Sequence, residues 1–124
     1  MATVTKRIVI SSDDVFSDVL SIDTTLASTI AKDATLERTK MAASAADTTI
    51  YLAASYTRAY IYMKNIDGGA TGNAACLIDF GTQLSMHLEK DDFAIFPWDS
   101  SGNIVAASET SGQLPLLEHA IFEF

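Results

Sequence analysis

Residues of the types that do acid–base chemistry are few in this chain and lie apart in the sequence. The two histidines are His87, in SMHLEK, and His119, in LEHAIF. Both lie in alternating segments, and His119 directly follows Glu118, so that its imidazole and that carboxylate point to opposite faces of a β-strand. We therefore expect each histidine to be a solvent-facing or packed structural residue. The many serines and aspartates leave a Ser-His-Asp grouping open, although no G-x-S-x-G elbow supports one.

Motifs for binding phosphates or metal ions are also missing from the sequence. The loop GGATGN at 68–73 lacks the Lys-Ser/Thr pair of a phosphate-binding P-loop. Asp13, Asp14 and Asp18 could hold calcium weakly, but solvated turn carboxylates are the simpler interpretation. Cys76, the single cysteine, lies in the apolar run AACLIDF and is expected to be a buried, inert thiol. The sequence predicts no enzyme, no bound metal and no cofactor.

Size and charge narrow the classes of partner. The chain has 124 residues, eight of them basic and 16 acidic, so its formal net charge is −8. Such a chain is repelled by phosphate backbones and by anionic lipid, and we expect neither direct nucleic-acid binding nor membrane binding. No stretch reaches the roughly 18 apolar residues of a membrane-spanning helix, and the short apolar run at 8–10 is too short for a signal peptide. We expect synthesis in the cytoplasm.

We expect β-strands to position these residues, because apolar and polar side chains alternate over most of the chain. A period of two is typical of strands, and turn residues recur about every 8–12 positions in the second half, as in sandwiches and barrels. The sequence predicts an all-β fold, a single antiparallel β-sandwich or jelly-roll-like domain over 1–124. The segment 40–47 is either a helical turn or a loop. The expected strands are residues 4–10, 21–31, 35–41, 48–54, 59–65, 75–80, 84–89, 93–98, 104–108 and 114–124.

The first residues, 1–14, are expected to form an extended arm or an edge strand. In VTKRIVI, Lys6 interrupts the apolar face that Val4, Ile8 and Ile10 would otherwise form. Lys6 and Arg7 are also the densest positive charge of an acidic chain, which makes them candidate contacts to an acidic partner. A plain first strand with solvated charges is the alternative.

The run FAIFPW is apolar on both of its faces. In a strand its residues divide into two sets, Phe93, Ile95 and Pro97 on one side and Ala94, Phe96 and Trp98 on the other. Such a strand is either covered on both sides by its own domain or meets a partner with one face. Phe96 and Trp98 are therefore candidate interface residues, and tryptophan often dominates interface energy. Phe122 and Phe124, in the last strand, are expected to be buried in the domain's own sheet or in a partner.

Five motifs of the second half form a recognisable order. They are the tyrosine-rich strand at 60–65, the glycine/asparagine loop at 68–73, a short strand at 76–80, the strand, acidic turn and FAIFP of 84–97, and a hydrophobic last strand at 118–124. In this order the chain resembles small virion structural proteins of tailed bacteriophages. The resemblance covers about half of the chain.

The resemblance implies a subunit of the virion that binds the particle surface or its tail as a symmetric oligomer. Since the chain is short and has no helical adaptor or fibre repeat, a capsid decoration (cement) subunit is the favoured member of this class. Its partners would be the major capsid protein or other virion proteins, and it would form a homo-oligomer, with a trimer favoured. The alternatives are a tail or head–tail junction component, a carbohydrate-binding β-sandwich with tyrosine rings as platforms, and a hydrolase on the same fold.

Overall fold

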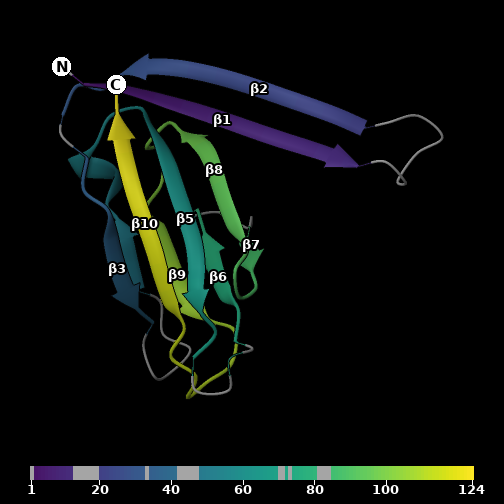
Figure 1. Cartoon of the computed structure of the whole chain (residues 1–124). Coiled ribbons are helices and arrows are strands. Elements are labelled where there is room, and N and C mark those ends of the chain that lie inside the picture. Colours follow the sequence, from purple (N-terminus) through teal and green to yellow (C-terminus); the bar gives the residue numbers. More distant parts are fainter. Residues whose placement is uncertain are drawn as a thin grey trace.

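Strands make up most of the chain, which confirms the all-β fold expected from the sequence (Figure 1). The computed structural model describes residues 2–12, 20–32, 34–41, 48–69, 72, 74–80 and 85–124. Within these ranges lie ten strands and one short 3-10 turn, η1 (Ala53–Ser55). The aspartates 13, 14 and 18 and the segment 42–47 lie outside the described residues, as does part of the loop 68–73.

The body of the molecule is an antiparallel β-sandwich of two sheets, which we call the front sheet and the back sheet. Among the described residues, the front sheet contains in spatial order β3 (Glu37–Lys40), β10 (Leu116–Glu123), β5 (Ala59–Asp67) and β8 (Phe93–Trp98). The back sheet contains β4 (Thr48–Tyr51), β9 (Ile104–Ser108), β6 (Cys76–Asp79) and β7 (Ser85–Leu88). Within the two sheets of the body, consecutive described strands mostly lie in opposite sheets, and β6 and β7 are the described pair that are neighbours in both sequence and space. The core is therefore closed by contacts between distant parts of the sequence.

β5, in the middle of the front sheet, shows why this sequence forms the sandwich. Ile61, Met63 and Asn65 are fully buried against the back sheet, whereas Tyr60 and Tyr62 are half-buried on the opposite face. This confirms the alternation read from the sequence. β-branched and aromatic residues also suit a pleated, half-buried surface better than a helix.

The core between the sheets is assembled from nearly every strand of the body. Cys76 lies in it with no exposed surface, and burial raises the pKa of its thiol to about 12, which confirms the expected buried cysteine. The core cluster consists of Met41, Tyr51, Ala59, Ile61, Met63, Cys76, Ile78, Leu88, Trp98, Ile104, Ala106 and Leu117.

Buried polar side chains connect the two sheets. His119 of β10 is 2% exposed, and its Nδ1 lies 2.8 Å from the hydroxyl of Tyr51 in the back sheet. Its Nε2 lies 2.9 Å from Thr39 Oγ1 on β3. Burial lowers the pKa of His119, and Glu37 opposes this in part. His119 is thus a packed structural residue that ties three strands together.

A hairpin of two long strands projects from one end of the sandwich (Figure 1). β1 (Thr3–Ser12) pairs with β2 (Leu20–Thr29) over its whole length, and we call this hairpin the arm. The base of the arm is held where Ala31 N–H donates to Glu123 O at 2.7 Å. The sequence indicated an arm or an edge strand only for 1–14, but β2 belongs to the arm as well. The alternation of side chains within β2 predicts that the segment is a strand, but it does not predict that β1 is the strand with which it pairs.

Candidate interaction surface

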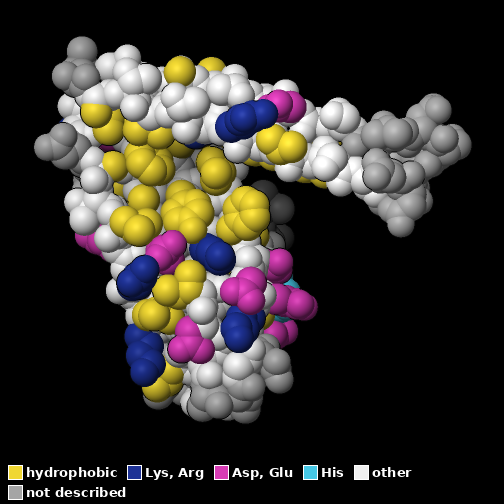
Figure 2. All heavy atoms as spheres, in the orientation of Figure 1, with side chains coloured by type: hydrophobic (Ala, Val, Ile, Leu, Met, Phe, Trp, Pro, Cys, Tyr) yellow, Lys and Arg dark blue, Asp and Glu magenta, His cyan; other side chains and the backbone are white. Residues whose placement is uncertain are grey.

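The outer face of the front sheet is apolar and rich in aromatic rings. Antiparallel register places Tyr60 beside both Phe122 and Pro97, and Tyr62 beside Ile95, all on the side away from the core. Figure 2 shows hydrophobic side chains gathered on the body directly below the arm. We call this surface the aromatic face, and it consists of Tyr60, Tyr62, Phe93, Ile95, Pro97, Ala120, Phe122 and Phe124.

Ring contacts fix the upper part of the aromatic face and the last residue of the chain. Phe124 stacks on Tyr60 with 5.2 Å between ring centroids and an interplanar angle of 27°. The guanidinium of Arg58 lies 5.1 Å from the Phe124 ring. Stacked rings and cation–π contacts each add to burial. Phe122 and Phe124, which the sequence predicted to be buried, lie half-buried on this face.

Charged side chains border the lower part of the aromatic face. Arg38 Nη2 lies 3.0 Å from Glu118 Oε2, and the hydroxyl of Tyr62 donates to Glu118 Oε1 at 3.0 Å. These contacts hold the pKa of the Glu118 carboxyl below its usual value, and the hydrogen bond from Arg38 has the larger effect. An apolar centre with a polar border is the usual anatomy of a protein interface.

The arm is amphipathic, and its apolar side faces the body. Lys6 shares a side with Ile8 and Ile10, and its Nζ lies 3.7 Å from the centre of the Tyr60 ring. Residues directly opposite in an antiparallel pair share a face. We call this side the underside of the arm, and it consists of Val4, Lys6, Ile8, Ile10, Ile22, Thr24, Leu26 and Ser28.

The two basic residues that the sequence singled out point in opposite directions. Lys6 is on the underside, where its Nζ also donates to Ser28 Oγ at 2.9 Å, and partial burial lowers its pKa. Arg7 is on the upper side, where it forms two hydrogen bonds of 2.9 and 2.7 Å with Asp23. Arg7 therefore has a partner within the arm, and Lys6 rests on the aromatic face.

An apolar wedge opens between the underside of the arm and β8. Ile8 and Ile10 line it from above, and Phe93 and Ile95 line it from below, around a volume of about 560 Å³. The side chains that line it are well exposed, at 42% for Ile8, 49% for Ile10 and 63% for Phe93. The underside of the arm and the outer side of β8 thus face each other across an open space and are not in full contact.

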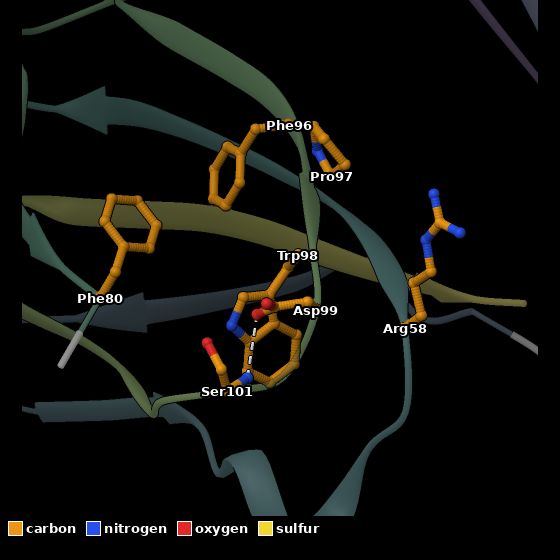
Figure 3. A pocket seen from close by; sticks show the side chains of 7 residues that line it. All are labelled: Arg58, Phe80, Phe96, Pro97, Trp98, Asp99 and Ser101. Carbon is orange, nitrogen blue, oxygen red and sulfur yellow. Dashed lines mark hydrogen bonds between the residues drawn. The ribbon is translucent and has the colours of Figure 1, made fainter.

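A second hollow, of about 590 Å³, lies beside the edge of the sandwich (Figure 3). Phe96 projects into it and meets Phe80 of the back-sheet side edge-to-face, with ring centroids 5.2 Å apart. Asp99 lies at its margin, where it accepts a hydrogen bond from Ser101 N–H at 3.0 Å and thereby shapes the turn. Phe96, a predicted interface residue, is half-buried in this apolar margin.

Trp98, the other aromatic residue singled out in β8, lies mainly in the core. It is 6% exposed, its indole N–H donates to Gly102 O at 3.2 Å, and its ring lies 6.1 Å from that of Tyr56. Of the two roles that the sequence left open, this position favours the core. The outward residues of the same strand, Phe93 and Ile95, are the ones available to a partner.

The residues with potential for acid–base chemistry are not brought together. His87 Nε2 on β7 lies 3.1 Å from Glu109 Oε1 at the surface, whereas His119 is enclosed in the core. The described part of the chain holds no group of three or more His, Cys, Asp or Glu residues arranged to bind a metal ion. The described segments also include no helix of the length and hydropathy that a membrane crossing requires.

Comparison with protein-family models, with curated proteins and with solved structures found no match to this chain. The interaction surface therefore has to be judged from its own geometry. Lys6, Phe122 and Phe124, which the sequence singled out as candidate partner contacts, lie on or against this surface, whereas Phe93, Ile95 and the β2 residues of the underside were not singled out. The alternation of these residues is visible in the sequence, whereas the strand pairing that places them on one surface is not.

Proposed function

We propose that the chain is a structural subunit of a tailed-phage virion and, within that class, a capsid decoration subunit. The observation that carries the proposal is the arm, which holds an apolar underside beyond the body of the sandwich. A surface displayed in this way serves contact with neighbouring subunits, because exposed apolar patches mark protein interaction sites.

The motifs that resemble phage virion proteins support the same proposal through their place in the fold. The tyrosine-rich strand is β5, FAIFPW is β8 and the hydrophobic last strand is β10. These are adjacent strands of the front sheet, and together they build the aromatic face. Three of the motif strands thus lie in the sheet that would meet a partner, whereas β6 and β7, which belong to the other motifs, lie in the back sheet.

A decoration subunit stabilises a shell by burying surface at junctions between its subunits. Apolar area removed from water contributes about 25 cal/mol per Å², although association costs consume much of this at any single contact. Repetition over many equivalent sites then multiplies a modest contribution per copy. Neither an active site nor a cofactor is required for this function.

The carbohydrate-binding alternative has less support from the geometry. The Tyr60 ring already contacts Lys6 and Phe124, and the Tyr62 hydroxyl is engaged by Glu118. Tyr51 and Trp98 lie in the core. A sugar platform needs an accessible ring face, and these rings are packed against protein.

Copy number in purified particles tests the proposal. Phage particles from cultures that produce this chain would be isolated on a density gradient and analysed by quantitative mass spectrometry against a labelled standard. On the order of hundreds of copies per particle is expected for a shell subunit, whereas about six or twelve would place the chain on the tail axis instead. Absence of the chain from intact particles would overturn the proposal.

A further inference from the structure

We propose that the outer half of the arm docks on the aromatic face of a second copy of this chain, so that the protein assembles into a closed homo-oligomer. This inference concerns the chain itself and does not depend on the proposed location in a virion. It rests on the reach of the arm, the chemistry of its underside and the vacant part of the aromatic face.

The arm is too long to be covered by its own body. Ten residues of β1 span about 33 Å at ~3.3 Å per residue, whereas four strands spaced ~4.8 Å apart cover about 14 Å between the outer strand axes. The arm runs across the front sheet, and Figure 1 shows its free end well beyond β8. Roughly half of the arm therefore overhangs the sheet.

The overhanging part is apolar on one side only. Ile10 and Ile22, at the outer end of the underside, are 49% and 43% exposed, and Ile8 and Leu26, nearer the body, are 42% and 47% exposed. Burial of such apolar side chains stabilises a fold, and an isolated two-stranded hairpin is only marginally stable in water. The upper side of the same strands consists mainly of Thr, Ser and the Arg7–Asp23 pair. A contact is thus expected at the underside.

The aromatic face of another copy is the surface that matches this underside. Within one chain, Lys6 at the inner part of the underside already rests on Tyr60 of that face. The wedge leaves the rest of the face, at Phe93 and Ile95, uncovered. Each copy therefore carries both an unused underside and an unused stretch of the face that accepts one.

Charge also directs a second copy to this surface. Two chains of net charge −8 repel each other at most relative orientations. The underside, however, contains one charged side chain, Lys6, and no carboxylate. Beside the aromatic face, Glu118 is paired with Arg38 and lies next to Lys64, which in turn lies beside Phe93. A contact of the underside with the face therefore brings few carboxylates together.

A contact of arm to face joins two different surfaces of identical chains. Such heterologous contacts close into rings when the rotation between copies permits, and otherwise extend into filaments. A ring leaves no arm and no face unused, and three copies are the number favoured under the resemblance to phage virion proteins. The number of copies follows from the experiment below.

The full chain would be measured by native mass spectrometry and by light scattering over a range of concentrations. Wild type is expected to form a multimer of the 13.3 kDa chain. Ile10→Lys, on the underside, and Ile95→Lys, on the aromatic face, are each expected to give monomers. Ser11→Lys is the matched control, because Ser11 follows Ile10 directly and is exposed on the upper side of the same strand. It is expected to keep the multimer.

Mixing the two defective variants distinguishes arm-to-face contact from arm-to-arm contact. Ile10→Lys retains an intact face and Ile95→Lys an intact arm, so their mixture is expected to form a heterodimer through one good contact. Thermal melts followed by circular dichroism would show that each variant is folded. A monomeric wild type, equal dissociation by Ser11→Lys and Ile10→Lys, or folded variants that form no heterodimer would each overturn the proposal.

Discussion

At the scale of single residues, the buried polar groups have structural roles that local sequence does not reveal. His119 pairs with Glu37 of β3 and follows Glu118 in its own strand, yet both of its ring nitrogens are engaged within the core. Asn65 shows a similar role, since its Nδ2 donates to Ala74 O and Leu88 O at 3.1 and 3.0 Å. Polar side chains of this kind connect the two sheets at defined positions.

His119 makes the fold sensitive to acid. Its pKa in the folded chain lies below the unfolded value of about 6.5, so the unfolded chain binds more protons between those two pH values. The stability contributed by neutral His119 is complete above that unfolded value and is lost as the pH falls through the folded pKa. We expect the melting temperature to fall between pH 7 and pH 5. His119→Gln should flatten this dependence, and His87→Gln should not; equal curves for all three proteins would contradict the assignment.

The two faces of β8 differ in what they contribute to stability. Trp98 points into the core, whereas Phe93 is 63% exposed on the aromatic face. Trp98→Ala is expected to lower the free energy of unfolding by about 3–5 kcal/mol, as for other large core residues. Phe93→Ala should cost less than about 1 kcal/mol in the monomer. Denaturant titrations at low protein concentration would measure both, and equal costs would mean that the two faces are misassigned.

At the scale of elements, the sequence predicted strands better than their partners. The alternation in AYIYMKN and in the last strand indicates which side chains share a face, and β5 and β10 confirm it. FAIFPW is apolar on both faces, so its core side became evident only from its pairing with β5. β2 shows the same limit, because its register with β1 depends on residues far from its own pattern.

The arm and the sandwich are expected to differ in protection from hydrogen exchange. β5 and β10 lie inside a sheet with a buried face, whereas β1 and β2 pair only with each other among the described strands. Local opening is easiest where few apolar contacts hold the backbone. Exchange measured by mass spectrometry should show weak protection of the arm in the Ile10→Lys monomer and stronger protection in the wild-type multimer. Equal protection in both states would contradict docking of the arm.

At the scale of the whole molecule, a compact sandwich carries more apolar surface than its own core uses. The surplus lies on the underside of the arm and on the aromatic face, and the wedge brings the two surfaces close without joining them. In an acidic chain, such surfaces are stable when neighbouring subunits cover them. The proposed assembly and the proposed shell decoration would both follow from that single property.

Isotope-filtered nuclear Overhauser measurements on a mixed multimer can locate the partner of the arm. One set of copies would carry labelled isoleucine methyls, and the other would be unlabelled. We predict contacts between labelled Ile10 methyls and the Phe93 ring of unlabelled copies, because the outer half of the arm lies on a neighbour. Contacts confined to single copies, with the wedge closed by the chain's own arm, would contradict this arrangement.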